Sequence, residues 1–250
     1  VMGLVEVLPH IRTLSRHIRE TVADIEASRP EILVTIDSPG FCHRVSKALR
    51  KTAAGRDLKI VHYVAPTVWA WKPKRAEKIA RFLDRLLVIL PFEPPYFEKH
   101  GLDTVFVGHS AVEQPAAGSL DIRDFQRDVG GRPVMLILPG SRKGEVRRLL
   151  PLFLEAFDRI KERHADLCGV IPAVEAVEDM IRAQIGDRDI AVVSHEMKAV
   201  AFGAGDVALA AGGTAILELL LVGVPTVAAY RVSPLSAFLV RRLLTITKYS

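Results

Sequence analysis

The chain has 250 residues, 49% of them hydrophobic, which is enough for one large domain or two smaller domains with a proper core. Its formal charge of +5 indicates anionic partners, and an aromatic content of only 6% disfavours the stacking platforms of single-stranded nucleic-acid binders. The two cysteines, Cys42 and Cys168, lack the spacing of a zinc site, and no apolar run is long enough to cross a bilayer. We therefore expect a cytoplasmic protein that binds no metal, cofactor or nucleic acid.

The first half of the chain alternates short apolar runs with amphipathic segments. Apolar residues at steps of three and four predict a helix that ends before Pro30. The strands expected after it are residues 32–36, 58–64, 86–90 and 104–107, with helical patterns at 44–51 and 74–83. Strands and helices in alternation are typical of a parallel sheet covered on both faces.

The second half repeats this pattern. We expect strands at residues 134–138, 168–171, 190–193, 207–210 and 224–229, and the main helices at 145–163, 175–185, 214–222 and 235–245. The intervening stretch Gln-Pro-Ala-Ala-Gly-Ser reads as a linker. The sequence thus predicts two Rossmann-like, doubly wound α/β domains: residues 1–113, a linker at 114–132, and residues 133–250.

A candidate phosphate site lies where the apolar run 134–138 gives way to a helical pattern. Gly140 and Ser141 allow backbone N–H groups to approach an anion, the helix start adds partial positive charge, and Arg142 adds a bidentate donor. The alternative for Arg142 is a surface salt bridge with Glu145.

A second loop of the same type follows the run 207–210. Gly213 and Thr214 begin a helix, and Glu218 lies one turn inside it, on the same side as Thr214, where its carboxylate can accept from a ribose diol. Together the two loops predict a site for a nucleotide diphosphate. Neither loop matches the P-loop or the dinucleotide fingerprint, so a nucleotide other than ATP or NAD is favoured. The alternative for Glu218 is an ordinary solvated helix acid.

Asp37 ends the first predicted strand, at the edge of a parallel sheet where open α/β folds place their ligands. A carboxylate at that edge can act as a general base. The alternative is that Asp37 only caps the helix that follows Pro39.

Several motifs occur in one order along the chain. They are Ile-Asp-Ser-Pro at 36–39, His-Tyr-Val-Ala-Pro-Thr-Val-Trp-Ala-Trp at 62–71, Leu-Pro-Phe-Glu at 90–93, Val-Gly-His at 107–109, and the two loops at 138–142 and 213–218. In this combination the chain resembles the lipid-A-disaccharide synthase family, over essentially its whole length. The resemblance implies a GT-B glycosyltransferase, in which two Rossmann-like domains face a cleft, the first of them on the acceptor side and the second binding the UDP-sugar.

The resemblance also implies an activity in lipid A and lipopolysaccharide biosynthesis. An inverting, metal-independent hexosyltransferase would join UDP-2,3-diacylglucosamine to 2,3-diacylglucosamine 1-phosphate, at the inner face of the cytoplasmic membrane of a Gram-negative-type cell. It would release UDP. Asp37 would then be the base that deprotonates the acceptor 6-hydroxyl, and Arg142 the partner of the leaving diphosphate.

The chain departs from the family pattern in a few places. Gly40 stands where a second acid is usual, and Glu113 replaces the acid that usually follows the Gly-His motif by four residues. The family's Gly-Glu-Ala-Ser-Gly-Asp type opening loop and its C-terminal tail are absent, so we expect a fragment that lacks sequence at both ends.

Weaker candidates flank these sites. Trp69 and Trp71 follow a strand and can hold a sugar or an acyl chain, or else plug the core, and His109 is either a ligand or a structural histidine. Apolar residues with basic borders between 235 and 248 predict an interfacial helix, against the alternative of ordinary core packing. The residues expected to contact an anionic membrane surface are Phe238, Leu239, Arg241 and Arg242.

Other functions remain open at this point. A 2-epimerase or a peptidoglycan transferase that uses UDP-N-acetylglucosamine would share the fold, although the Trp69-Ala70-Trp71 block and the loop 138–142 speak against both. A catalytically silent nucleotide-binding, membrane-docking module is the third alternative, if the ends are truly absent. The sequence is compatible with a homodimer and does not reveal the acyl-chain preference.

Overall fold

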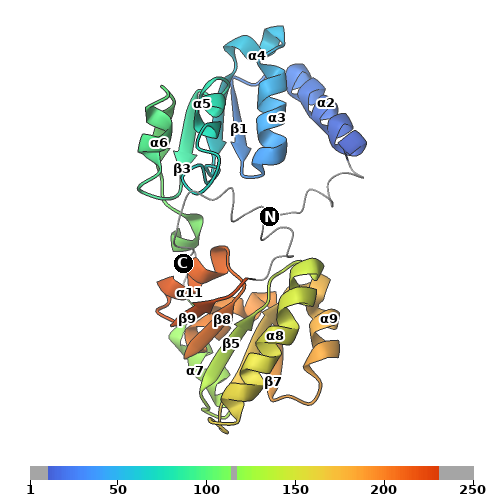
Figure 1. The fold of residues 1–250 in the computed structure, drawn as a ribbon, viewed down its shortest axis with the longest axis vertical. Coiled ribbons are helices and arrows are strands. Elements are labelled where there is room, and N and C mark those ends of the chain that lie inside the picture. The colour runs from blue at the N-terminus through green and yellow to red at the C-terminus, as the bar shows by residue number, and fades with distance from the viewer. Residues whose placement is uncertain (1–10, 114–116, 231–250) are drawn as a thin grey trace. The chain divides into compact units, whose positions relative to one another are not determined.

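The computed structural model describes residues 11–113 and 117–230, which form two compact units (Figure 1). The first unit runs to His109 and the second begins at Ser110. Each unit is built on its own parallel sheet, so the expected pair of α/β domains is confirmed.

The first unit has a four-stranded sheet in the order β1-β2-β3-β4. Its strands are β1 (Ile32–Ile36), β2 (Lys59–Tyr63), β3 (Arg85–Val88) and β4 (Asp103–Phe106). Its helices are α2 (Ile11–Ser28), α3 (Pro39–Leu49), α4 (Ala53–Asp57), α5 (Arg75–Ala80) and α6 (Pro94–Glu98).

Within the described residues the core of the first unit lies on one face of its sheet, whereas we expected both faces to be covered. Ile60, Leu86 and Val88 of the strands are buried there against α3, α5 and α6, and the apolar stripe of α2 packs at the margin. On the opposite face Ile32, Val34, Ile36 and Val105 are exposed within the described residues, Val34 by 56%. The alternation along β1 follows from its pleat, which points successive side chains to opposite faces.

The second unit has a five-stranded sheet in the order β7-β6-β5-β8-β9. Its strands are β5 (Val134–Leu138), β6 (Cys168–Ala173), β7 (Ile190–Ser194), β8 (Val207–Ala210) and β9 (Thr226–Ala228). Its helices are α7 (Ser119–Asp128), α8 (Lys143–Lys161), α9 (Glu175–Ile185), α10 (Lys198–Ala204) and α11 (Thr214–Leu221), with 3-10 turns at Ser110–Glu113 (η2) and His195–Met197 (η3).

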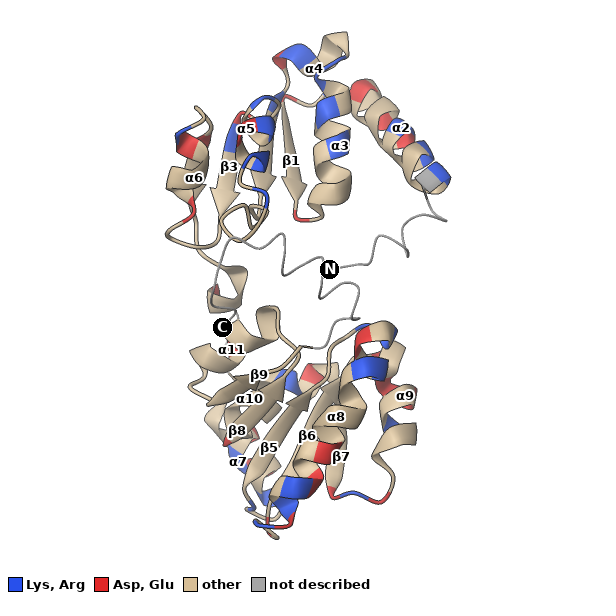
Figure 2. Cartoon of the chain, in the orientation of Figure 1, with Lys and Arg blue, Asp and Glu red and all other residues tan. Residues whose placement is uncertain are grey.

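Both faces of the second sheet are covered. One apolar cluster joins the strands to α8 and α9, through residues such as Leu150, Phe153 and Ile181, and another joins them to α7, α10 and α11, through Phe125, Phe202 and Leu219. The strands carry no charged residue and appear tan throughout in Figure 2. Continuous apolar strands are what a sheet buried on both faces requires.

The order in which the chain adds strands to this sheet changes direction at β5. From β5 it proceeds outward to β6 and β7, and it then returns to place β8 on the other side of β5. Open α/β sheets bind ligands at such a topological switch point, outside the carboxyl ends of the strands. The fold therefore singles out the loops that follow β5 and β8.

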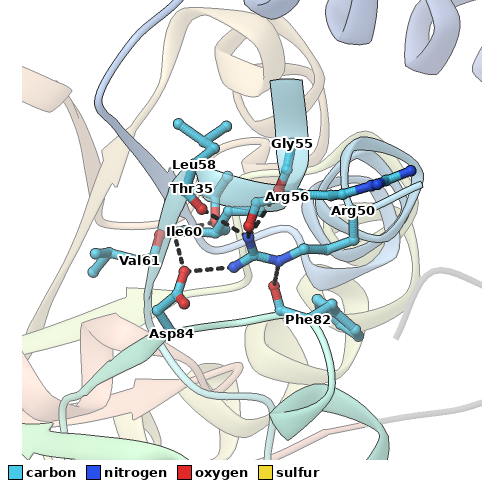
Figure 3. Close-up of polar contacts among 9 residues, drawn as sticks. All are labelled: Thr35, Arg50, Gly55, Arg56, Leu58, Ile60, Val61, Phe82 and Asp84. Carbon is cyan, nitrogen blue, oxygen red and sulfur yellow. Dashed lines mark hydrogen bonds and ion pairs between the residues drawn. The ribbon is translucent and has the colours of Figure 1, made fainter. Parts of the chain in front are cut away.

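A hydrogen-bonded ion pair joins segments at the amino-terminal edge of the first sheet (Figure 3). Arg50 Nη2 lies 2.5 Å from Asp84 Oδ2, which also accepts from the backbone N–H of Ile60 at 2.6 Å. The remaining donors of the same guanidinium reach the carbonyl oxygens of Phe82, Gly55, Arg56 and Leu58.

The amino-terminal edge of the second sheet is built in a similar way. Asp189 accepts from Arg132 and Lys161 at 2.5 and 2.7 Å, and the hydrogen bond from Arg132 is the main cause that lowers the pKa of this carboxyl. Asp206, directly before β8, accepts from the backbone N–H of Val134 at 2.8 Å. In both units an aspartate thus ties the start of its own strand to the neighbouring strand.

Several details differ from the sequence-based expectation. Helix α7 lies within the stretch 114–132 that we expected to be a linker, because its Phe125 is buried in the second unit. Helix α3 begins at Pro39 rather than at 44, as proline favours the first helical position. The expected helix 235–245 lies outside the described residues. Among the helices that the structure describes, none is long and apolar enough to span a membrane.

Candidate functional site

The two predicted phosphate loops lie side by side at the switch point of the second sheet. Strands β5 and β8 pair directly, with Leu138 opposite Ala210, and the N–H of Ala211 donates to the carbonyl of Leu138 at 2.8 Å. Both strands run into a loop and a helix start at the same sheet edge. The structure thus brings Gly140, Ser141 and Arg142 near Gly213 and Thr214, as the pairing of their strands requires.

The loop after β5 turns sharply before the 19-residue helix α8. Gly140 has a φ of 110°, and a Cβ there would lie 2.7 Å from a Glu145 carboxylate oxygen, so glycine is required. Arg142 is the N-cap residue and its side chain is 70% exposed, with one guanidinium nitrogen 2.9 Å from Glu145. The ion pair with Glu145 that we considered as an alternative therefore forms, on an arginine side chain that is exposed enough to reorient.

The loop after β8 contains two glycines with positive φ, Gly212 and Gly213, and helix α11 begins at Thr214. Glu218, one turn further on, forms an ion pair with Lys198, the first residue of α10. Both side chains are mostly buried, with 15% of Glu218 and 23% of Lys198 exposed. Glu218 is therefore not an ordinary solvated helix acid.

The Lys198–Glu218 pair lines a cavity of about 450 Å³. The other walls come from the second unit alone, and they include His195 and Glu196 of η3, Phe202 of α10, and Ala111 and Val112 of η2. Sequence reasoning missed Lys198, because a lone lysine at the start of a short helix carries no signal of a buried partner.

Asp37 follows β1 in the first unit, in a strained turn. Asp37 and Ser38 have φ values of 47° and 43°, which non-glycine residues seldom adopt. The N–H of Asp37 donates to the carbonyl of Tyr63 at 2.9 Å, which fixes this turn to the end of β2. The N-cap residue of α3 is Ser38 and no side chain caps the helix, so the capping alternative for Asp37 is not observed.

Two buried histidines lie beneath this turn. His43 of α3 and His62 of β2 meet edge to face, with ring centroids 4.6 Å apart, and His62 Nδ1 lies 2.7 Å from the hydroxyl of Thr35. Burial lowers the pKa of His43 to about 3 and that of His62 to about 4, and Arg75 lowers both further. Both rings are thus neutral near pH 7. Asp37 acts in the opposite direction on His62, which places its charge close to that ring.

The loops after β2 and β3 meet through a buried carboxylate. Glu93 is 1% exposed, accepts from the backbone N–H of Leu90 at 3.0 Å and lies 3.4 Å from the indole nitrogen of Trp69. Burial raises its pKa. Phe92 packs edge to face on Trp69, with centroids 5.3 Å apart. Trp69 is therefore held within the first unit, which favours the structural alternative for this residue.

The remaining candidates lie near the same sheet edge. Lys72 Nζ lies 4.4 Å above the ring of Trp71, and His109 follows β4 after Gly108, whose φ is 81°. Within residues 11–113 and 117–230 no group of three acids, histidines or cysteines could hold a metal ion. The membrane candidates Phe238, Leu239, Arg241 and Arg242 lie outside the described residues.

Comparison with known proteins decides the family. The family model for lipid-A-disaccharide synthetase matches residues 1–250. The chain belongs to this family. It is similar to the lipid-A-disaccharide synthases of Ruegeria pomeroyi, 44% identical over 98% of this chain and 64% of the relative, and of Paramagnetospirillum magneticum, 45% identical over 98% and 63%. The chain thus spans less than two thirds of the length of these relatives.

Solved structures support the fold. Staphylococcus aureus MnaA, solved with UDP, superposes with a TM-score of 0.62 at 12% identity, over 86% of this chain and 61% of that protein. The UDP-GlcNAc 2-epimerase of Methanocaldococcus jannaschii superposes with a TM-score of 0.60 at 12% identity, over 88% and 65%. At this identity the likeness concerns the fold alone, and it confirms the expected α/β class. The epimerase alternative gains no support, because the relatives at 40% identity or more are synthases.

Proposed function

We propose that the protein carrying this chain is a lipid-A-disaccharide synthase that joins UDP-2,3-diacylglucosamine to 2,3-diacylglucosamine 1-phosphate. Membership of the family supports the reaction. The observation that carries the nucleotide site is the pairing of β5 with β8, which brings two glycine-containing helix starts together at the switch point of the second sheet.

In the proposed reaction the acceptor 6-hydroxyl attacks the anomeric carbon of the UDP-sugar. The bond from O6 to C1 forms, the bond from C1 to the diphosphate oxygen breaks, and the hydroxyl proton passes to Asp37. Arg142 and the starts of α8 and α11 stabilise the charge that develops on the departing UDP. Glu218 accepts from the ribose diol. The cleft that would bring the two units to one substrate stays a prediction.

The test is direct. Full-length protein, incubated with both substrates, should release UDP and the disaccharide 1-phosphate in equal amounts, and omission of either substrate should abolish both products. EDTA should leave the rate unchanged, because the protein cations and helix starts act in place of a metal ion. Epimerisation of UDP-N-acetylglucosamine without disaccharide formation would contradict the proposal.

We also propose that the protein binds the inner face of the cytoplasmic membrane without spanning it. Both substrates carry acyl chains, and Phe238 and Leu239 with their basic neighbours are the candidate contact. Binding to vesicles of anionic lipid should weaken as salt rises. Replacement of Phe238 and Leu239 by serine should reduce vesicle binding more than the melting temperature. If the double variant binds vesicles as the wild type does, the contact lies elsewhere.

A further inference from the structure

The Lys198–Glu218 ion pair joins two helices that contribute to one apolar cluster, and both of its side chains are mostly buried, which sets it apart from the surface pairs of this chain. Helix α10 buries Ala201, Phe202 and Ala204, and α11 buries Leu219 in the same apolar cluster. The Lys198 ammonium also lies 5.5 Å from the centroid of the Phe202 ring. Its head group is thus fixed from two sides, by a carboxylate and by an aromatic face.

The pair lies where the proposed nucleotide would present its ribose. Glu218 is one turn inside the helix whose first residues form the phosphate loop, and the carboxylate and the ammonium both line the cavity. The ion pair uses Oε2 of Glu218, and among the described residues no hydrogen bond occupies Oε1, which can therefore accept from a ligand. A mostly buried carboxylate without a counter-charge raises the free energy of the folded chain. A long side chain without a second contact also has several rotamers.

We propose that Lys198 is a positioning residue for nucleotide binding: it neutralises Glu218 and holds its free carboxylate oxygen toward the ribose hydroxyls. The proposal rests on the proposed function, because it takes the ligand to be a uridine diphosphate. It assigns to Lys198 no contact with the diphosphate. Loss of the lysine should therefore weaken the contribution of the ribose hydroxyls to the binding affinity.

The experiment measures, by calorimetry on the full-length protein, the affinities of UDP, 2′-deoxy-UDP and uridine. The wild type should bind UDP about tenfold more tightly than 2′-deoxy-UDP, as expected for one hydrogen bond to a charged acceptor. Lys198→Met, which keeps the apolar stem, should weaken UDP about tenfold and leave 2′-deoxy-UDP nearly unchanged. Lys198→Arg should restore most of the preference for UDP. Arg163→Met removes an exposed charge from the same unit and is the matched control.

The outcomes separate the proposal from the function on which it rests. If Lys198→Met weakens UDP and 2′-deoxy-UDP equally while uridine is unchanged, Lys198 acts on the diphosphate and the positioning role is wrong. A wild type that binds both diphosphates with one affinity also overturns the positioning role, while the nucleotide site stands. A wild type that binds no UDP overturns the proposed function itself. A single cooperative unfolding transition above the temperature of the calorimetry shows that Lys198→Met is folded, even if the unpaired Glu218 lowers the melting temperature.

Discussion

The amino-terminal and carboxyl-terminal edges of the two sheets are built from different kinds of contact. At the amino-terminal edges, carboxylates such as Asp84 and Asp206 accept hydrogen bonds from the backbone of neighbouring strands. The guanidinium of Arg50 donates to Asp84 and to several backbone carbonyl oxygens. At the carboxyl-terminal edges, Asp37 stands in a strained turn and Arg142 is exposed. The difference teaches that charged hydrogen bonds tie the strands together at one edge of each sheet, whereas the residues that the proposed function uses follow the strands at the other edge. Variants at the amino-terminal edges should therefore lower the free energy of unfolding, and variants at the carboxyl-terminal edges should lower turnover or the affinity for UDP.

The largest effect is expected at Asp37. Asp37→Asn should lower turnover about 100-fold or more, because a lost general base is worth roughly that factor. The melting temperature and the affinity for UDP should not change, since no helix cap is lost and the nucleotide loops belong to the other unit. Asp57→Asn, an exposed aspartate of the same unit, is the control. Near-normal turnover of Asp37→Asn would remove Asp37 as the base.

The converse variant is Asp84→Ala at the amino-terminal edge. It should lower the free energy of unfolding by about 2 kcal/mol, because Arg50 and the N–H of Ile60 lose a charged acceptor. Turnover per folded molecule should stay normal. Asp206→Ala, which removes one backbone contact in the second unit, should cost about half as much. Urea denaturation measures the free energy of unfolding of both variants. A variant that loses turnover but keeps its full stability would contradict the difference between the two edges.

A smaller effect is expected at Arg142. Arg142→Lys should weaken UDP binding about tenfold and slow the reaction, because an ammonium lacks the planar fork of a guanidinium. Glu145→Gln removes the ion pair with Arg142 and should leave UDP binding intact or slightly tighter. Calorimetry checks both variants. Should Arg142→Lys bind UDP normally, the ion pair with Glu145 is the whole role of this arginine.

The smallest effect concerns the buried histidines. Their pKa values, about 3 for His43 and about 4 for His62, lie below the unfolded value of about 6.5, so the unfolded chain takes up protons first as the pH falls. The stability that each neutral ring contributes is present above pH 6.5 and should decline by about 1 kcal/mol by pH 5.5. His62→Gln should flatten this dependence in urea denaturation between pH 7 and 5.5. An unchanged slope would show that His62 takes up its proton at the same pH in the folded and the unfolded chain, so that burial does not lower its pKa.

Sequence reasoning predicted the strands and the loops well, because the strands of both sheets are short apolar runs between helical patterns and the two glycine-containing loops have local signatures. It also predicted that Asp37 ends a strand. It missed Lys198 and the histidine pair, since their partners lie 20 and 19 residues away, a spacing set by tertiary packing alone. It placed a linker over α7, because the Gln-Pro-Ala-Ala-Gly-Ser stretch that leads into this short helix is typical of a linker.

The Trp69 loop has a consequence for spectroscopy. Both tryptophans of the 250 residues, Trp69 and Trp71, lie on this one loop, in different surroundings. One indole nitrogen approaches the Glu93 carboxylate and the other ring lies under the Lys72 ammonium. Tryptophan emission from these residues therefore reports on the carboxyl-terminal edge of the first sheet, because residues 110–250 contain no tryptophan. A titration followed by emission can thus test, without a label, whether the proposed acceptor binds at this edge, and Trp71→Phe would assign the signal to one of the two rings.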